Sequence, residues 1–218
     1  MWCHNDHTAF KFSTNGQITP EGQAGQILIR CIKDNKLNTI VDIGTWNGLG
    51  STRCFLLGLV GNTTTRLISL ESNKDKHAAA ITNLRDMLTD RTELLWGTLL
   101  RPEDIPTSEL TRVFPEITTN TEFARWHSID IENMKIAPYI FDTLPETIDF
   151  VLFDGGEFTT YFEFQRLFPH CARFIALDDV NVSKCSHIRN FLRSHGGWRE
   201  VESISERNGF SLFKKIGS

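Results

Sequence analysis

One segment of the chain carries most of the information about its architecture: Val41-Asp42-Ile43-Gly44-Thr45-Trp46-Asn47-Gly48-Leu49-Gly50-Ser51. A β-branched run (38–43) enters a loop with three glycines, and an almost wholly apolar run (49–59) follows it. This order predicts a buried strand, a tight turn and a buried helix. Glycines allow a backbone to turn sharply and to approach a ligand, and the start of a helix offers free amides to an anionic group. The alternative is a structural turn without a ligand.

Strands and helices alternate on both sides of this loop. The pattern predicts helices at 23–33, 74–88, 158–168 and 183–194, and further strands at 66–70, 92–96, 148–153 and 174–177. Two last strands, 198–203 and 210–214, flank Asn208-Gly209, which is a strong hairpin signal. Such alternation predicts an α/β fold, with a doubly wound, mostly parallel seven-stranded sheet and an antiparallel C-terminal hairpin.

Residues 99–147 interrupt this alternation between the third and fourth predicted strands. The segment holds five of the seven prolines, and we expect one short helix in it near Glu122–Met134. A connection of this length is often functional. It is therefore a candidate lid over a site at the strand ends, and the alternative is a surface decoration.

Composition and charge narrow the class of protein. Hydrophobic residues make up 40% and charged residues 23% of the 218 residues, which is typical of a globular chain and excludes disorder. The net charge of −4 argues against a general nucleic-acid binder. The segment from Lys184 onward is locally basic, and we expect those charges to form a solvated helix face. The longest apolar stretch (54–60) is too short to cross a membrane, and Met1–His7 does not have the pattern of a secretory signal.

The cysteines indicate a reducing environment. They are scattered and lack metal-ligand spacing: Cys3, Cys31, Cys54, Cys171 and Cys185. We expect reduced thiols, mostly in the core, and a cytoplasmic location.

The glycine loop has the pattern aspartate-x-glycine-x-x-x-glycine-x-glycine, and Glu71 ends the next predicted strand. A phosphate-binding loop would need glycine-lysine-serine/threonine, and a dinucleotide fingerprint would need glycine where Arg53 stands. The pattern resembles motif I of the class I S-adenosylmethionine-dependent methyltransferases. The resemblance spans residues 21–215 and implies a single Rossmann-like methyltransferase domain over 1–218 with S-adenosylmethionine as cofactor.

The same resemblance implies a set of cofactor-binding residues. The three loop glycines would surround the methionine part, and Asp42 would support the loop or reach the amino group through water. Glu71 would accept hydrogen bonds from both ribose hydroxyls. The positions after the third strand would lie near the adenine. The full set is Asp42, Gly44, Gly48, Gly50, Glu71, Ser72, Gly97 and Thr98.

Acids also follow the fourth and fifth predicted strands. Asp154 ends one strand, and Asp178 and Asp179 end the other. If these strands are neighbours, three carboxylates converge and need a cation, and oxygen ligands favour magnesium, calcium or manganese. The alternative is that Asp178 caps a turn and Asp179 pairs with an arginine such as Arg189.

The acids and Asp154-Gly155-Gly156-Glu157 resemble the catechol-type small-molecule O-methyltransferases, also called methyltransferase type 24. There, the equivalents of Asp154, Asp178 and Asp179 hold a divalent ion that binds the substrate hydroxyl and lowers its pKa. Those relatives have histidine or lysine as base where this chain has Glu157. Glu157 and Asp154 are the predicted catalytic residues, and His127 is a less favoured base.

These residues together predict S-adenosylmethionine-dependent O-methylation of a small molecule, with or without a divalent ion. One alternative is metal-independent transfer to nitrogen or to a macromolecule. The signature for methylation of nucleic-acid bases, Asn/Asp-Pro-Pro-Tyr/Phe, is absent after residue 153. The other alternative is a binding or scaffold protein that keeps the fold without catalysis.

Overall fold

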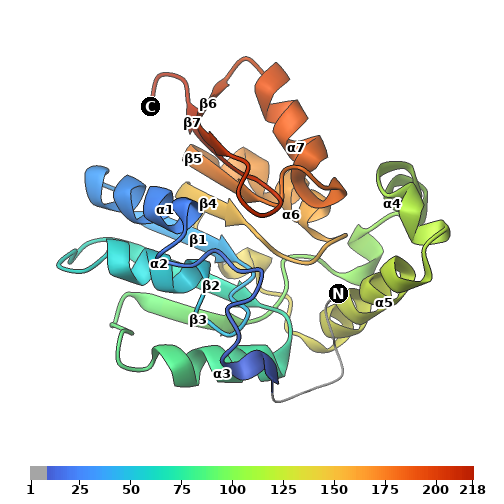
Figure 1. The fold of residues 1–218 in the computed structure, drawn as a ribbon, viewed down its shortest axis with the longest axis horizontal. Coiled ribbons are helices and arrows are strands. Elements are labelled where there is room, and N and C mark those ends of the chain that lie inside the picture. Colours follow the sequence, from blue (N-terminus) through green and yellow to red (C-terminus); the bar gives the residue numbers. More distant parts are fainter. Residues whose placement is uncertain (1–8) are drawn as a thin grey trace.

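The computed structural model describes residues 9–218 and contains one seven-stranded sheet (Figure 1). The strand order is β3-β2-β1-β4-β5-β7-β6. All neighbouring pairs are parallel except β5–β7 and β6–β7. This confirms the predicted Rossmann-like doubly wound sheet with an antiparallel hairpin at its end. The strands are β1 (Thr39–Ile43), β2 (Arg66–Glu71), β3 (Thr92–Trp96), β4 (Ile148–Phe153), β5 (Cys171–Asp178), β6 (Trp198–Ile204) and β7 (Phe210–Lys215).

Helices cover both faces of the sheet because successive strand residues point to opposite sides. Phe150 of β4 packs edge-on against Phe55 of one helix layer, and Phe153 of the same strand packs edge-on against Phe164 of the other. The first layer contains α1 (Gln23–Asp34), α2 (Ser51–Gly58) and α3 (Lys74–Leu84), and the second contains α6 (Thr160–Leu167) and α7 (Ser183–Ser194).

The segment 99–147 is folded and lies at one end of the molecule, on the right in Figure 1. It contains α4 (Thr107–Val113) and α5 (Thr121–Ile136), and the Asn120 side chain caps α5 by accepting bonds from the amides of Glu122 and Phe123. The expected helix is therefore present and longer than predicted. A third apolar cluster, centred on the edge-to-face pair of Phe114 and Phe158, joins the segment to the residues before α6.

Helix α3 ends earlier than the predicted range of 74–88. It stops at Leu84, and it buries Ala79, Ala80 and Leu84, whereas Ile81 is 43% exposed.

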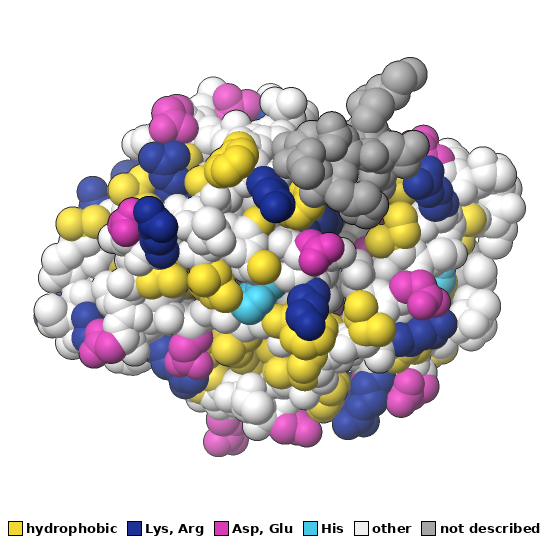
Figure 2. Space-filling view, turned by 90° about the horizontal axis from the view of Figure 1, so that it is seen from below, with side chains coloured by type: hydrophobic (Ala, Val, Ile, Leu, Met, Phe, Trp, Pro, Cys, Tyr) yellow, Lys and Arg dark blue, Asp and Glu magenta, His cyan; other side chains and the backbone are white. Residues whose placement is uncertain are grey.

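The predicted burial of the thiols agrees with the structure for the cysteines that it describes. Cys31, Cys54, Cys171 and Cys185 are buried and free, while Cys3, His4 and His7 lie outside the described residues. No helix in the described part of the chain combines the length and hydropathy needed to cross a membrane. Figure 2 shows basic, acidic and hydrophobic side chains of the described residues interspersed over one face.

Candidate functional site

A cavity of about 720 Å³ opens at the carboxyl ends of the central strands. Its wall includes the loops after β1, β2, β4 and β5, together with part of α5. Open α/β sheets bind ligands at this edge, where the direction of strand order reverses, here between β1 and β4. The volume suits a nucleoside-sized ligand with a small second molecule.

The loop after β1 reaches the cavity through Gly44, Thr45 and Trp46. Gly44 has a φ of +96°, and a Cβ there would overlap the backbone carbonyl of Asp154. Its amide and that of Thr45 both donate to the Leu70 carbonyl at 3.0 Å, which ties the loop to β2. Only glycine fits this position.

The other two loop glycines do not line the cavity. A Cβ on Gly48 would lie 2.6 Å from the Leu84 side chain of α3, and one on Gly50 would lie 2.5 Å from Gln17. Both glycines thus permit close packing behind the loop.

Asp42 also stands behind the loop, fully buried and away from the cavity wall. Its carboxylate accepts hydrogen bonds from three hydroxyls, those of Ser51 (3.1 Å), Thr52 (2.6 Å) and Ser69 (2.8 Å). Burial raises the pKa of Asp42 to about 6, although the three hydroxyls act in the opposite direction. The geometry places Asp42 as a support of the loop.

Glu71 lies at the end of β2 and lines the cavity, with 7% of its surface exposed. One carboxylate oxygen accepts a bond from the Trp46 amide and the other from the Asn73 amide, both at 2.8 Å. Burial raises the pKa of Glu71, and the nearby ammonium of Lys76 opposes that shift. Lys76, which the sequence did not single out, lies 3.5 Å from the centroid of the Trp46 ring.

Ser72, Gly97 and Thr98 complete the predicted cofactor set on the cavity wall. A Cβ on Gly97 would lie 2.6 Å from Ile140, and the Thr98 amide donates to the Pro138 carbonyl at 2.9 Å. The end of the 99–147 segment is therefore held against the end of β3.

The three predicted metal ligands lie together. One carboxylate oxygen from each of Asp154, Asp178 and Asp179 falls within 4.8 Å of the others. Asp179 has a φ of +56°, an uncommon conformation for a residue other than glycine.

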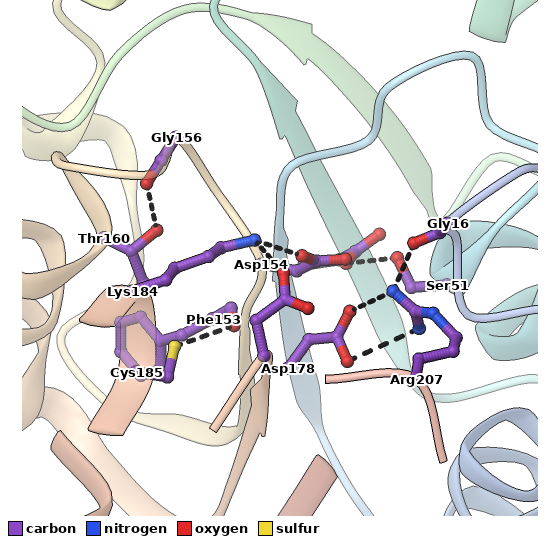
Figure 3. A network of polar contacts seen from close by, with 12 residues as sticks. Gly16, Ser51, Phe153, Asp154, Gly156, Thr160, Asp178, Lys184, Cys185 and Arg207 are labelled. Atoms are coloured by element: carbon purple, nitrogen blue, oxygen red, sulfur yellow. Dashed lines mark hydrogen bonds and ion pairs between the residues drawn. The ribbon is translucent and has the colours of Figure 1, made fainter. Parts of the chain in front are cut away.

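Two cations already contact these carboxylates, as Figure 3 shows. The Lys184 ammonium lies 2.6 Å from Asp154 Oδ1 and 3.1 Å from Asp179 Oδ2. Arg207 reaches Asp178 from the other side, with Nη2 2.9 Å from Oδ2, and also donates to the Gly16 carbonyl.

These contacts correct one expectation and one alternative about the C-terminal part of the chain. Lys184 is not on a solvated helix face, since only 5% of it is exposed. The cation that pairs with Asp179 is Lys184, while Arg189 binds Glu200 at 2.9 Å. The sequence missed Lys184 because its main partner, Asp154, lies 30 positions away in the chain.

The protonation of this cluster follows from its mutual charges. Burial alone would lower the pKa of Lys184, but Asp154, Asp179 and Asp178 raise it well above its ordinary value. Burial raises the pKa of Asp178 to about 7, and the neighbouring carboxylates add to that shift. For Asp179 burial is the largest single influence and acts to raise the pKa, but Lys184, Asn208 and Arg207 together outweigh it, so the pKa is lowered. The ammonium is thus held in its charged form.

A second group of acids lines the cavity: Glu157, Asp130 of α5 and Glu163 of α6. Burial raises all three pKa values, that of Asp130 to about 7 and that of Glu163 to about 8. Glu163 Oε2 is buried with no hydrogen-bond partner among the described residues. An acid among the inward phenylalanines of a helix, Phe162 and Phe164, was the sequence signal that could have found Glu163.

His127 lies outside the cavity wall. Its ring packs edge-on to Phe158 with centroids 6.2 Å apart, and burial lowers its pKa. This position favours packing over proton transfer.

The fold matches solved structures at low sequence identity, and several of these are described as methyltransferases. Cofactor-bound Rv0187 from MTB has 16% identity and a TM-score of 0.62, over 96% of this chain and 86% of that chain. An O-methyltransferase from Bacillus cereus in complex with SAH has 18% identity and a TM-score of 0.58, over 88% of this chain and 80% of that one. The O-methyltransferase TomG from Streptomyces achromogenes, in complex with SAM, has 15% identity and a TM-score of 0.58, over 88% and 79%.

No protein-family model matches the sequence, and no curated protein matches it at significant similarity. At these identities the structural neighbours establish the fold, and the chemistry has to be argued from the cavity.

Proposed function

We propose that the protein is an S-adenosylmethionine-dependent methyltransferase that acts on an oxygen atom of a small molecule. The observation that carries this proposal is the juxtaposition of the Gly44 turn and the buried Glu71 carboxylate on one cavity at the sheet switch point. Solved neighbours of the same fold were crystallised with SAM or SAH, which supports the choice of ligand.

Each part of the cofactor has a fitting partner on the cavity wall. Glu71 has lone pairs beyond its two amide contacts and would accept the ribose hydroxyls. The backbone of Gly44-Thr45-Trp46 would follow the methionine part, and Gly97 and Thr98 would lie by the adenine. Asp42, Gly48 and Gly50 would act indirectly, by holding the loop in shape.

The acceptor side lies where α5 faces the loop after β4. Phe123 and Trp126 of α5 line the cavity together with Glu157, Asp154 and Lys184. Aromatic side chains would orient a flat acceptor, and positioning contributes much of the acceleration of an in-line displacement. When bound, the cofactor supplies a methyl group on a sulfonium. Glu157, whose pKa is raised, would take the acceptor's hydroxyl proton.

The predicted divalent ion is the less supported part of the sequence hypothesis. Three carboxylates suit magnesium or manganese in their chemistry. However, Lys184 and Arg207 already bind oxygens of all three, so the residues present do not fit an ion while these cations stay in place. No step is therefore assigned to a metal.

Calorimetry with S-adenosylhomocysteine tests the cofactor site. We expect binding with a Kd below about 100 μM and, at a hundredfold excess over Kd, stabilisation of about 2.7 kcal/mol. Gly44→Val should abolish binding because its side chain would overlap the Asp154 carbonyl, whereas Gly22→Ala, whose Cβ would meet its nearest atom at 3.5 Å, should bind normally. No heat and no stabilisation with the intact protein would favour a binding or scaffold protein.

Mass spectrometry tests the acceptor class. Incubation with the cofactor and a panel of phenols and catechols should give products 14 mass units heavier (about one CH₂), while matched amines and oligonucleotides should not. Transfer only to amines would support the nitrogen-directed alternative. The four buried free thiols also support our proposal of a cytoplasmic location.

A further inference from the structure

We propose that the Lys184 ammonium takes the place of a divalent cation between Asp154, Asp178 and Asp179, and that the protein works without a metal. The catalytic half of this inference rests on the proposed function. The half that concerns metal binding rests only on the geometry of the cluster and is tested separately.

The position of Lys184 is fixed by its helix. It is the second residue of α7, and its buried neighbours Cys185 and Ile188 hold that end of the helix against the sheet. Figure 3 shows its side chain pointing toward Asp154. The distances of 2.6 Å and 3.1 Å to Asp154 and Asp179 are those of charge-assisted hydrogen bonds.

The ammonium and a divalent ion would compete for the same oxygens. With all three carboxylates ionised, Lys184 and Arg207 leave one net negative charge, which a divalent ion would turn into one net positive charge. Magnesium needs oxygens at about 2.0–2.1 Å, which would bring it into repulsive contact with an ammonium bonded to the same carboxylates. One buried site of this size therefore holds one of the two cations.

The Lys184 ammonium has one N–H group that Asp154 and Asp179 do not use. Lysine carries three N–H donors, and two of them are used on Asp154 and Asp179. Lys184 and Glu157 both line the cavity. The third N–H would donate to the acceptor oxygen and stabilise its negative charge, which is the electrostatic task of a metal at such a site.

In the proposed methyl transfer, each proton and electron pair has a defined destination. The acceptor O–H proton passes to the Glu157 carboxylate, the oxygen forms its bond to the methyl carbon, and the carbon–sulfur bond breaks with its electron pair going to sulfur. Lys184 keeps its proton throughout, because its neighbours hold its pKa well above the ordinary value. Lys184 would thus be a catalytic residue that donates a hydrogen bond while its own protonation state stays unchanged.

Manganese binding, followed by electron paramagnetic resonance, tests the inference. We expect no binding to the intact protein at up to about 1 mM Mn²⁺, and at least about tenfold tighter binding to Lys184→Ala, in which the three carboxylates lose their main cation. Lys33→Ala removes an exposed lysine of α1 and should behave like the intact protein. Methyl transfer by the intact protein should persist in EDTA, and Lys184→Met should lower kcat by about 100-fold or more.

Two outcomes would overturn the inference. One is micromolar Mn²⁺ binding by the intact protein, and the other is loss of its methyl transfer in EDTA. Both measurements use the unaltered chain, so they decide the question even if Lys184→Ala does not fold. S-adenosylhomocysteine affinity measured on the same samples separates the two proposals, since the Mn²⁺ result stands even if that ligand fails to bind.

Discussion

Glu71 joins two loops through one side chain. Its oxygens accept the Trp46 and Asn73 amides, and the carboxylate faces the cavity. Glu71→Gln keeps the size of the side chain but removes its charge and leaves one acceptor oxygen in place of two, because the amide NH₂ only donates. We expect about tenfold weaker binding of S-adenosylhomocysteine, because a hydrogen bond to a charged group contributes about 1.5–3 kcal/mol. Isothermal calorimetry measures the change.

Glu93→Gln is the matched control for this substitution. Glu93 lies on the neighbouring strand β3 and pairs with Arg66 at 2.5 Å, with over a third of its side chain exposed. Its loss should leave the affinity within about twofold. Equal affinities of Glu71→Gln and the intact protein would contradict the assignment of Glu71 to the ribose.

Some residues of the site could be predicted from the sequence and others could not. Gly44 and Glu71 could be found because each stands at the end of a strand with a recognisable local pattern. Lys184 and Asp130 could not, because their importance depends on partners brought together by folding. Glu163 left one indirect signal, an acid between the inward phenylalanines of a helix. The convergence of Asp154 with Asp179 was predicted from adjacent strands, while the cation between them was not.

Helix α5 is the element that closes one side of the cavity. Asp130, Asn133 and Met134 line it, and the Asn133 side chain accepts a bond from Asn73 at 3.2 Å. If α5 is a lid, S-adenosylhomocysteine should slow amide hydrogen exchange over residues 121–136 by several-fold, measured by mass spectrometry. Residues 23–34 of α1 serve as the internal reference, since they do not line the cavity. Unchanged exchange in α5 at saturating ligand would favour a surface decoration.

Glu200 links α7 to the C-terminal hairpin through ion pairs and a hydrogen bond. Its carboxylate accepts bonds from Arg189 (2.9 Å), Arg193 (2.6 Å) and Ser211 (2.7 Å), and only 17% of the side chain is exposed. Glu200→Ala should lower the free energy of unfolding by about 1–3 kcal/mol, because it leaves these donors without an acceptor. Urea denaturation measures the loss.

Glu202→Ala provides the control on the same strand, β6. Its partner is Arg30, and both side chains are well exposed, at 39% and 56%. We expect a change below about 0.5 kcal/mol. Similar losses in the two variants would mean that the Glu200 network does not hold the hairpin.

Across the whole molecule, buried acids set the dependence of stability on pH. Burial raises the pKa of Asp42 to about 6, of Asp130 and Asp178 to about 7, and of Glu163 to about 8. The folded protein then keeps protons that the unfolded chain releases, so stability falls as pH rises from about 4.5 to about 8. His127, with its lowered pKa, works in the opposite direction. Urea denaturation should therefore give a higher free energy of unfolding at pH 5.5 than at pH 8.

Glu163→Gln isolates one of these groups. It removes a carboxyl whose buried oxygen has no partner among the described residues. The variant should be more stable than the intact protein at pH 8, by about 1 kcal/mol or more, and the difference should shrink toward pH 5. A difference that does not change with pH would show that Glu163 titrates normally.

The overall architecture was largely accessible from the sequence. The regular alternation of apolar strands and helices predicted the sheet, and Asn208-Gly209 predicted the reversal at its end. The 99–147 segment resisted prediction because α4 is short and both of its helices are held by a shared apolar cluster with Phe158. Its place over the cavity depends on tertiary contacts such as that between Ile140 and Gly97.

The reactivity of the buried thiols should report when the protein unfolds. Burial raises the pKa of Cys31, Cys54 and Cys171 to about 12, so hardly any reactive thiolate exists in the folded protein. These sites are spread over both sides of the sheet, in α1, α2 and β5. In a Cys3→Ser variant, alkylation by iodoacetamide should follow the opening of the molecule. Labels on separate peptides should then appear together if the sheet opens as one cooperative unit.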